Sequence, residues 1–287
     1  YLFNYHYFQK QYENDIVKNN DEEKTKQLKK LVTPFILRRN KKEVLTELPD
    51  KIEQNIILPF NDEEEKLYVA NLAEVNKELQ ELYDLEGSDK MQILKLLTRL
   101  RQLCLEPRLV YDNIDQPSSK LKACMELIKT MQENKQKVLL FSSFTSVLDL
   151  IAEECQKAGI TYYMLTGSTN KEDRRELVSR FQKDDTTVFL ISLKAGGTGL
   201  NLTSAEAVIH FDPWWNVSAQ NQATDRAYRI GQKNNVQVFN LVMKDSVEEK
   251  IIELQKRKKE LADMFVENNS GGLSQMSKED ILSLFTM

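Results

Sequence analysis

The stretch TVFLISLKAGGTGLNLTSAEAVIHFDPWWN spans residues 187–216. It holds two short apolar runs, 187–191 and 207–211, and a polar, glycine-containing segment lies between them. Strands this apolar are typical of a parallel sheet that is buried on both faces, because no side of the strand is left polar for water. The stretch therefore predicts a parallel α/β fold.

Further runs of the same kind lie outward from this stretch, at 137–141 (KVLLF), 161–165 (TYYML) and 236–242 (VQVFNLV). Amphipathic segments long enough for helices separate most of them, such as SVLDLIAEECQKAG and KEDRRELVSRFQ. Strands that alternate with helices predict a mostly parallel sheet with helices on both faces.

The regions on either side of these runs show other patterns of apolar and polar residues. The run KIEQNIIL lies between Pro49 and Pro59, and its residues alternate enough for a strand. Residues 61–110 are expected to be all helix, with Asn61 or Asp62 as the N-cap and Pro107 at the end. Residues 111–120 suit a linker between domains. Residues 246–268 form a long amphipathic pattern with Ser246 as its cap, and SKEDILSLF suits a short final helix.

Composition narrows the function classes. The 287 residues carry a net charge of −4, so any nucleic-acid contact must rest on a local basic patch. With two histidines, His6 and His210, imidazole catalysis is nearly excluded. The three cysteines, Cys104, Cys124 and Cys155, form no C-x-x-C pair and are expected to be buried thiols, without a metal site.

The start of the chain has neither the layout of a signal peptide nor an initiator methionine. We therefore expect an intracellular protein whose given sequence begins within a longer chain. No apolar run approaches the length of a membrane helix, so no membrane partner is expected.

Ligands of open parallel sheets bind at the carboxyl ends of the strands. There the loop after 187–191 carries Gly196, Gly197 and Gly199, which would let the backbone approach a phosphate. An irregular connection between a strand and a helix explains the same glycines. The chain contains neither G-x-G-x-x-G nor G-x-x-x-x-G-K-[ST], which argues against a Rossmann-type enzyme and leaves no P-loop.

The segment DRAYRIGQ (225–232) spaces Arg226 and Arg229 three residues apart, which predicts one face of a helix. Guanidinium groups bind phosphate oxygens through two parallel hydrogen bonds. The alternative is an ordinary solvated face, with Asp225 or Glu248 as partners. Trp214 and Trp215 leave a similar choice, since at least one is expected in the core and the other could stack beside a nucleic-acid strand.

Taken in order, FSSFT, LTGSTNKEDRRELVSRFQ, SLKAGGTGLNLTSAE, HFDPWWN and QATDRAYRIGQ resemble the second motor lobe of the SWI/SNF-type helicase-like ATPases of helicase superfamily two. The resemblance covers nearly the whole chain. It implies a RecA-like lobe at 116–245, preceded by the tail of the first lobe with a connecting segment (1–60) and a helical insertion (61–115). Residues 246–287 would be C-terminal helices that pack on the motor.

The resemblance also implies roles for single residues. Arg226 and Arg229 match the arginine fingers that reach ATP, and Gln222 belongs to the same motif. Gly197 and Gly199 match a motif that couples ATP to DNA. Residues matched to DNA contacts are Gly167, Ser168, Ser192, Lys194 and Trp215.

The implied activity is ATP-dependent translocation on double-stranded DNA that remodels or displaces a DNA-bound protein, such as RNA polymerase or a nucleosome. ATP and Mg²⁺ would be bound mainly by the first motor lobe, so the chain by itself is expected to be inactive. An RNA helicase lobe and a non-catalytic interaction module remain alternatives. The expected location is the bacterial nucleoid in the cytoplasm, or the nucleus in a eukaryote.

Overall fold

The computed structural model describes residues 5–13, 15–16, 21–32, 34, 48–84, 90–196 and 199–265. The chain divides into two compact units, Tyr1–Glu47 with Lys256–Asn269, and Leu48–Gln255 with Ser270–Met287. In the smaller unit, α1 (Tyr5–Phe8), the π-helix η1 (Gln9–Glu13) and α3 (Glu22–Val32) are described, and Asp21 caps α3 through the amides of Glu23 and Lys24. The larger unit carries every predicted site residue.

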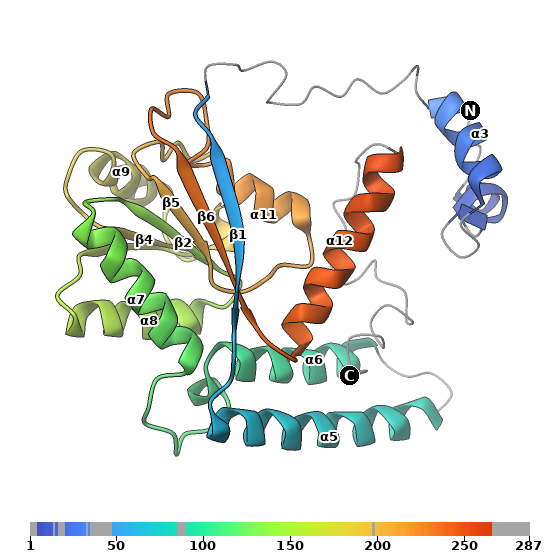
Figure 1. Ribbon diagram of the computed structural model, residues 1–287, viewed down its shortest axis with the longest axis horizontal. Helices are drawn as coiled ribbons and strands as arrows, with labels where there is room; N and C mark the ends of the chain where they lie inside the picture. The colour runs from blue at the N-terminus through green and yellow to red at the C-terminus, as the bar shows by residue number, and fades with distance from the viewer. Residues whose placement is uncertain are drawn as a thin grey trace. The chain divides into compact units, whose positions relative to one another are not determined.

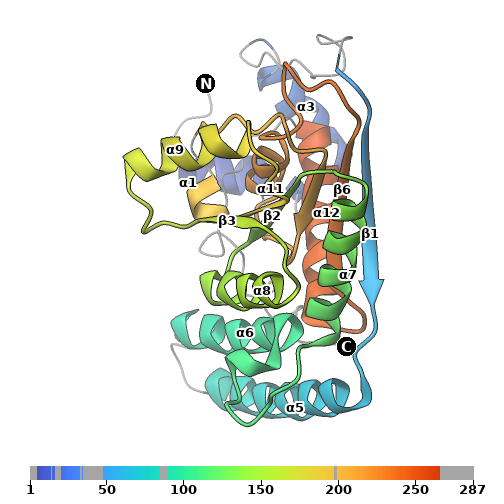
Figure 2. The same cartoon turned by 90° about the vertical axis from the view of Figure 1, so that its left-hand side faces the viewer.

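The larger unit is built on a six-stranded sheet in the order β1-β6-β5-β2-β4-β3, in which every neighbouring pair is parallel. Figures 1 and 2 show the sheet and the helices around it. The strands are β1 (Lys51–Leu58), β2 (Val138–Ser142), β3 (Tyr162–Leu165), β4 (Val188–Ser192), β5 (Ala207–His210) and β6 (Val236–Met243). Each predicted strand is thus present within about two residues of its expected bounds.

Helices cover both faces of the sheet, and alternate residues of one strand point to opposite sides. Val138 and Leu140 pack in a cluster with α7 (Ser119–Glu133) and α8 (Thr145–Lys157). Leu139 and Phe141 join a second cluster with α9 (Lys171–Phe181), α10 (Leu193–Gly196) and α11 (Val217–Thr224). The period of two in the side chains explains why these strands are apolar at every position.

The helical insertion consists of α5 (Asp62–Asp84) and α6 (Lys90–Leu105), which lie side by side (Figures 1 and 2). Asn61 begins α5, because its Oδ1 accepts from the amides of Glu63 and Glu64 at 3.0 and 2.9 Å, while Glu64 accepts from the Asn61 amide at 3.1 Å. This reciprocal cap confirms Asn61 as the start. Pro107 opens the short 3₁₀ helix η3 (Pro107–Leu109) that follows α6.

A third hydrophobic cluster joins the insertion to α12 (Val247–Phe265). It contains Leu97 and Leu100 of α6, Val247 and Ile251 of α12, and Trp215. At its edge Lys120 Nζ lies 2.6 Å from both carboxylate oxygens of Glu248, and these side chains are 0% and 1% exposed. The Met243 amide also donates to Glu248, at 2.8 Å. The pair ties the starts of α7 and α12 to the end of β6.

Strand β1 comes from the segment 1–60 and pairs with β6 along its whole length, as an edge strand of this sheet. The domain boundaries expected from the sequence otherwise remain predictions. The predicted final helix lies outside the described residues.

The three cysteines are buried free thiols, as expected. Within the described part of the chain, no helix has the length and apolar character needed to cross a membrane. In the same part, no cluster of His, Cys, Asp or Glu is arranged to hold a metal ion.

Candidate nucleotide and DNA site

Arg226 and Arg174 contact α10, the short helix that directly follows the carboxyl end of β4, and the charge of Arg229 acts on Arg226. Arg226 donates from Nε to the Gly196 carbonyl at 3.1 Å, and the Arg174 guanidinium of α9 donates to the Ala195 carbonyl. Arg226 is half-buried and Arg229 is exposed. Two cations at this turn, with a third close to one of them, are suited to bind an anion such as a phosphate.

The charges of this cluster act on one another. Burial lowers the pKa of Arg226, the neighbouring charge of Arg229 lowers it as well, Asp225 raises it, and Arg174 lowers it. Mutual repulsion of this kind is relieved when an anion binds between the cations. The alternative partner Glu248 is wrong, because Glu248 is buried against Lys120.

The prediction that both arginines lie on a helix is wrong. Helix α11 ends at Thr224, and Arg226 and Arg229 lie in the turns that follow. The Arg226 carbonyl accepts from the Leu202 amide at 3.0 Å instead of from a residue four positions on. The Gln232 side chain further bonds the carbonyls of Ala205 and Ala227, at 2.8 and 3.2 Å. These contacts, two of them with the segment before β5, replace helical hydrogen bonds and hold the arginines in an irregular loop.

Two glycines fit this loop system because of their backbone angles. Gly199 has φ +49° and Gly231 has φ +100°, values that side chains with a Cβ rarely adopt. Gly199 follows α10, and Gly231 ends the segment that carries Arg229. Gly197, which the resemblance matches to the same motif as Gly199, lies outside the described residues.

The residues matched to DNA contacts fall into two groups. Lys194 on α10 is exposed, as are Gly167 and Ser168 in the turn after β3. Ser192 is only 4% exposed, and its hydroxyl accepts from the Ala195 amide at 3.3 Å. Ser192 therefore shapes the turn that presents Lys194 and offers little surface of its own.

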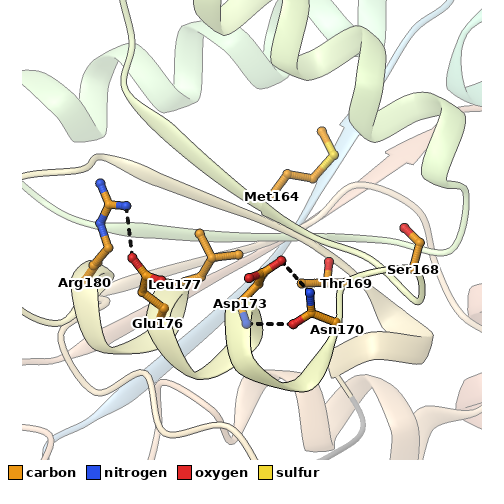
Figure 3. A pocket seen from close by; sticks show the side chains of 8 residues that line it. All are labelled: Met164, Ser168, Thr169, Asn170, Asp173, Glu176, Leu177 and Arg180. Atoms are coloured by element: carbon orange, nitrogen blue, oxygen red, sulfur yellow. Dashed lines mark hydrogen bonds and ion pairs between the residues drawn. The ribbon is translucent and has the colours of Figure 1, made fainter.

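An open pocket of about 430 Å³ lies between the end of β3 and α9 (Figure 3), lined by Met164, Ser168, Thr169, Asn170, Asp173, Glu176, Leu177 and Arg180. Arg180 is occupied by Glu176 at 3.5 Å, and Asn170 donates to Asp173 at 2.8 Å. The pocket contains two carboxylates, those of Asp173 and Glu176, which would repel a phosphate. The arginine cluster is therefore the better anion site.

Trp215 is 5% exposed and packs in the cluster that joins α5, α6 and α12. The expectation that at least one tryptophan of the pair lies in the core is confirmed, because the large ring of Trp215 fills this cluster. The DNA contact to which the resemblance matches Trp215 stays a prediction. Its Nε1 has no hydrogen-bond partner among the described residues. Trp214 is the partly exposed member of the pair.

Buried polar groups fix the helix that precedes the arginines. Gln220 of α11 donates to Asn240 Oδ1 of β6 at 2.9 Å, and Asn240 donates to Asn55 of β1 at 2.9 Å. Thr224, the last residue of α11, lies 2.9 Å from His210 Nε2. Gln222 is exposed on the same helix. The network joins β1, β6 and β5 to the end of α11, two residues before Arg226.

His210 gives this network a pH dependence. Burial lowers its pKa to about 4, and the charges of Glu53 and Asp212 only partly oppose this. Because the unfolded histidine titrates near 6.5, the unfolded chain binds more protons between these pH values. The histidine's share of stability is therefore complete above pH 6.5 and is lost as the pH falls towards 4.

We expect His210 to lower the free energy of unfolding by about 2 kcal/mol between pH 7 and pH 5. Urea titrations at both pH values check this, with His210→Gln as the comparison. The variant should lose that part of the acid sensitivity, while carboxylates such as Glu53 still contribute theirs. Equal pH slopes for both proteins would contradict the burial of a neutral His210.

Sequence reasoning missed several residues that build the site. Arg174 lies in the helix predicted over KEDRRELVSRFQ, but its contact with the Ala195 carbonyl depends on how α9 packs. Gln220 and Asn240 are polar residues in apolar surroundings, the one signal that could have marked them. Their partners lie on other strands and are not visible in sequence spacing.

The comparisons with known proteins agree with this architecture. The model of the helicase conserved C-terminal domain matches residues 119–231, and that of the SNF2-related domain matches residues 1–109. An uncharacterised ATP-dependent helicase of Mycoplasma pneumoniae is 38% identical over 270 residues, which are 92% of this chain and 26% of that protein. The chain spans between 26% and 31% of the length of the first curated bacterial relatives that it matches.

Two solved structures from Sulfolobus solfataricus have the same fold. The SWI2/SNF2 ATPase core in complex with double-stranded DNA is 31% identical with a TM-score of 0.67, covering 99% of this chain and 60% of that one. The SWI2/SNF2 ATPase C-terminal domain is 26% identical with a TM-score of 0.63, covering 82% of this chain and 98% of that one. The chain therefore belongs to the SWI/SNF-type helicase-like ATPases, and it contains the RecA-like C-terminal motor lobe of that family.

Proposed function

We propose that this chain is the second lobe of an ATP-dependent translocase on double-stranded DNA. Arg226 and Arg229 act as the arginine fingers on ATP, and Gln222 and Gly199 belong to the same nucleotide-facing edge. The observation that carries the proposal is the contact of Arg174 and Arg226 with α10, where burial lowers the pKa of Arg226 and the charge of Arg229 lowers it further.

The nucleotide itself is held mainly elsewhere in this proposal. The chain has no P-loop, so a first motor lobe supplies the contacts to the phosphates and to Mg²⁺. Closure of the two lobes places the fingers on the terminal phosphates, and hydrolysis opens them again. By this account the chain alone does not turn over ATP.

The DNA backbone runs along the turn that carries Lys194 and the turn with Gly167 and Ser168. These exposed groups lie after β4 and β3, which are neighbours in the sheet. Contacts to phosphates position the duplex without reading its sequence. The DNA-bound protein that such a motor displaces is a polymerase or a nucleosome in this proposal.

Lys194→Ala tests the DNA path. We expect weaker binding of duplex DNA and a salt slope smaller by about one unit, because one phosphate contact is lost. Fluorescence anisotropy with a labelled duplex, titrated at several salt concentrations, measures both. Lys129→Ala is the matched control, since Lys129 is an exposed lysine of α7 that pairs with Glu126 at 2.8 Å.

The same titration separates the alternatives. An unchanged salt slope for Lys194→Ala would remove that contact from the proposal. Tighter binding of double-stranded RNA than of duplex DNA would favour an RNA helicase lobe. A chain that binds neither polymer would favour the non-catalytic interaction module.

A further inference from the structure

Arg101 of α6 lies buried against the loop DPWWN, which follows β5. Its Nη2 donates to Asp212 Oδ2 at 2.9 Å, to Ser143 Oγ at 3.0 Å and to the Pro213 carbonyl at 3.4 Å. The side chains of Arg101 and Asp212 are 6% and 1% exposed. One residue of the helical insertion thus contacts two loops at the carboxyl edge of the sheet.

The carboxylate of Asp212 is the centre of these contacts. Its Oδ1 accepts from Ser142 Oγ at 2.7 Å and from the Ser143 amide at 3.0 Å. Its Oδ2 accepts from Ser143 Oγ and from Arg101. The ends of β2 and β5 and the helix α6 are therefore held together at one carboxylate.

Aromatic rings surround the guanidinium group. Its central carbon lies 4.9 Å from the ring centroid of Phe144, 5.8 Å from that of Trp214 and 5.3 Å from that of Trp215. Burial lowers the pKa of Arg101, and Asp212 raises it. Arg101 therefore contacts both tryptophans of the loop as well as the carboxylate of Asp212.

A buried ion pair is weak evidence for stability, because well-packed apolar residues often serve a core as well or better. What an apolar side chain could not do here is hold Asp212 and the Pro213 carbonyl at once. The contacts therefore indicate a role in setting the position of the loop.

We propose that Arg101 is a positioning residue for the loop 212–216, and that through Asp212 it also holds the end of β2, the strand beside β4 and the Lys194 turn that follows it. This inference rests on the proposed function. The helical insertion thereby becomes part of the DNA-binding apparatus, because it carries the group on which the loop is seated. Loss of Arg101 then weakens DNA binding without removing a phosphate-binding side chain.

The tryptophans offer a direct readout. The sequence contains two tryptophans, Trp214 and Trp215, and both lie over Arg101, so intrinsic fluorescence reports on this loop. For Arg101→Met we expect a shifted emission maximum and about tenfold weaker binding of a labelled duplex, because the loop no longer holds its place at the edge. The matched control is Arg99→Met on the same helix, whose arginine is 35% exposed and pairs with Glu74 at 3.0 Å.

Arg101→Met leaves Asp212 buried without its cation, so this variant protein can fail to fold. Arg101→Lys is the second variant, since it keeps a cation opposite Asp212 but loses the flat contact with the rings. A melting temperature near that of the original chain, a shifted emission and about threefold weaker DNA binding support the proposal. A folded Arg101→Lys protein with unchanged emission and unchanged affinity overturns it.

The remaining outcomes separate this inference from the proposed function. An emission shift without loss of DNA affinity makes Arg101 a packing residue alone and overturns the inference. A loss of affinity as large in Arg99→Met also overturns it, because the effect would then follow from surface charge. If the unsubstituted chain binds no duplex DNA in a salt-dependent way, the proposed function fails first.

Discussion

Arg229→Ala in the complete ATPase is expected to lower DNA-stimulated turnover by about 10³–10⁵-fold, the range measured for arginine fingers. Arg229 is exposed at the end of a loop that Leu202, Ala205 and Gln232 hold in place, so its side chain is free to meet a phosphate carried by another lobe. Steady-state phosphate release at saturating ATP and duplex DNA measures the effect. Affinity for duplex DNA should stay close to that of the original protein.

Arg99→Ala is the control for this experiment, because it removes a half-buried arginine from the helical insertion. It should leave turnover nearly unchanged. A large loss of DNA affinity with normal turnover in Arg229→Ala would exchange the assigned roles and place Arg229 on the DNA. Equal turnover of the two variants would remove Arg229 from catalysis.

Lys120→Met is expected to lower the free energy of unfolding of this chain by about 3–5 kcal/mol, the usual cost of removing one partner from a buried ion pair. The reason is that Glu248 would keep its place at the amide of Met243 but lose the cation 2.6 Å away. Burial already raises the pKa of Glu248, and loss of the lysine raises it further. Urea unfolding followed by circular dichroism measures the change.

A control variant and a double variant test this explanation. Lys129→Met on the same helix removes an exposed lysine that pairs with Glu126, and should change stability by about 0.5 kcal/mol or less. Adding Glu248→Gln to Lys120→Met should recover part of the loss, since the amide still accepts from Met243 and carries no charge. A loss below about 1 kcal/mol in Lys120→Met would mean that the interior adapts to an isolated carboxylate.

The strands could be predicted because each is decided by its own residues. In the runs at 138–142 and 188–192 every position is buried, so a continuous apolar run sufficed to identify them. Strand β1 was also recognised, but its place beside β6 was not. Pairing with a strand 185 positions later depends on the path of the whole chain.

The site residues were likewise predictable from the sequence only in part. The sequence identified Arg226, Arg229 and Lys194 through the order of motifs. The structure places Lys194 on α10 and Arg226 in contact with it, and the charge of Arg229 acts on Arg226. The sequence was wrong about the helix under the arginines, because Gln232 and Leu202 compete for the backbone there. It also left open which of the two tryptophans is buried, because the burial of Trp215 depends on how α5, α6 and α12 pack.

The sequence by itself determined the parallel α/β lobe, the family and the residue types at the nucleotide-facing edge. These features rest on apolar periodicity and on short motifs, which are local properties of the chain. Only the tertiary structure decided that Arg101 lies against Asp212, that Lys120 lies against Glu248 and that Arg174 joins the arginine cluster. Each of these contacts joins distant segments, and a buried charge shows its partner only once the chain has folded around both.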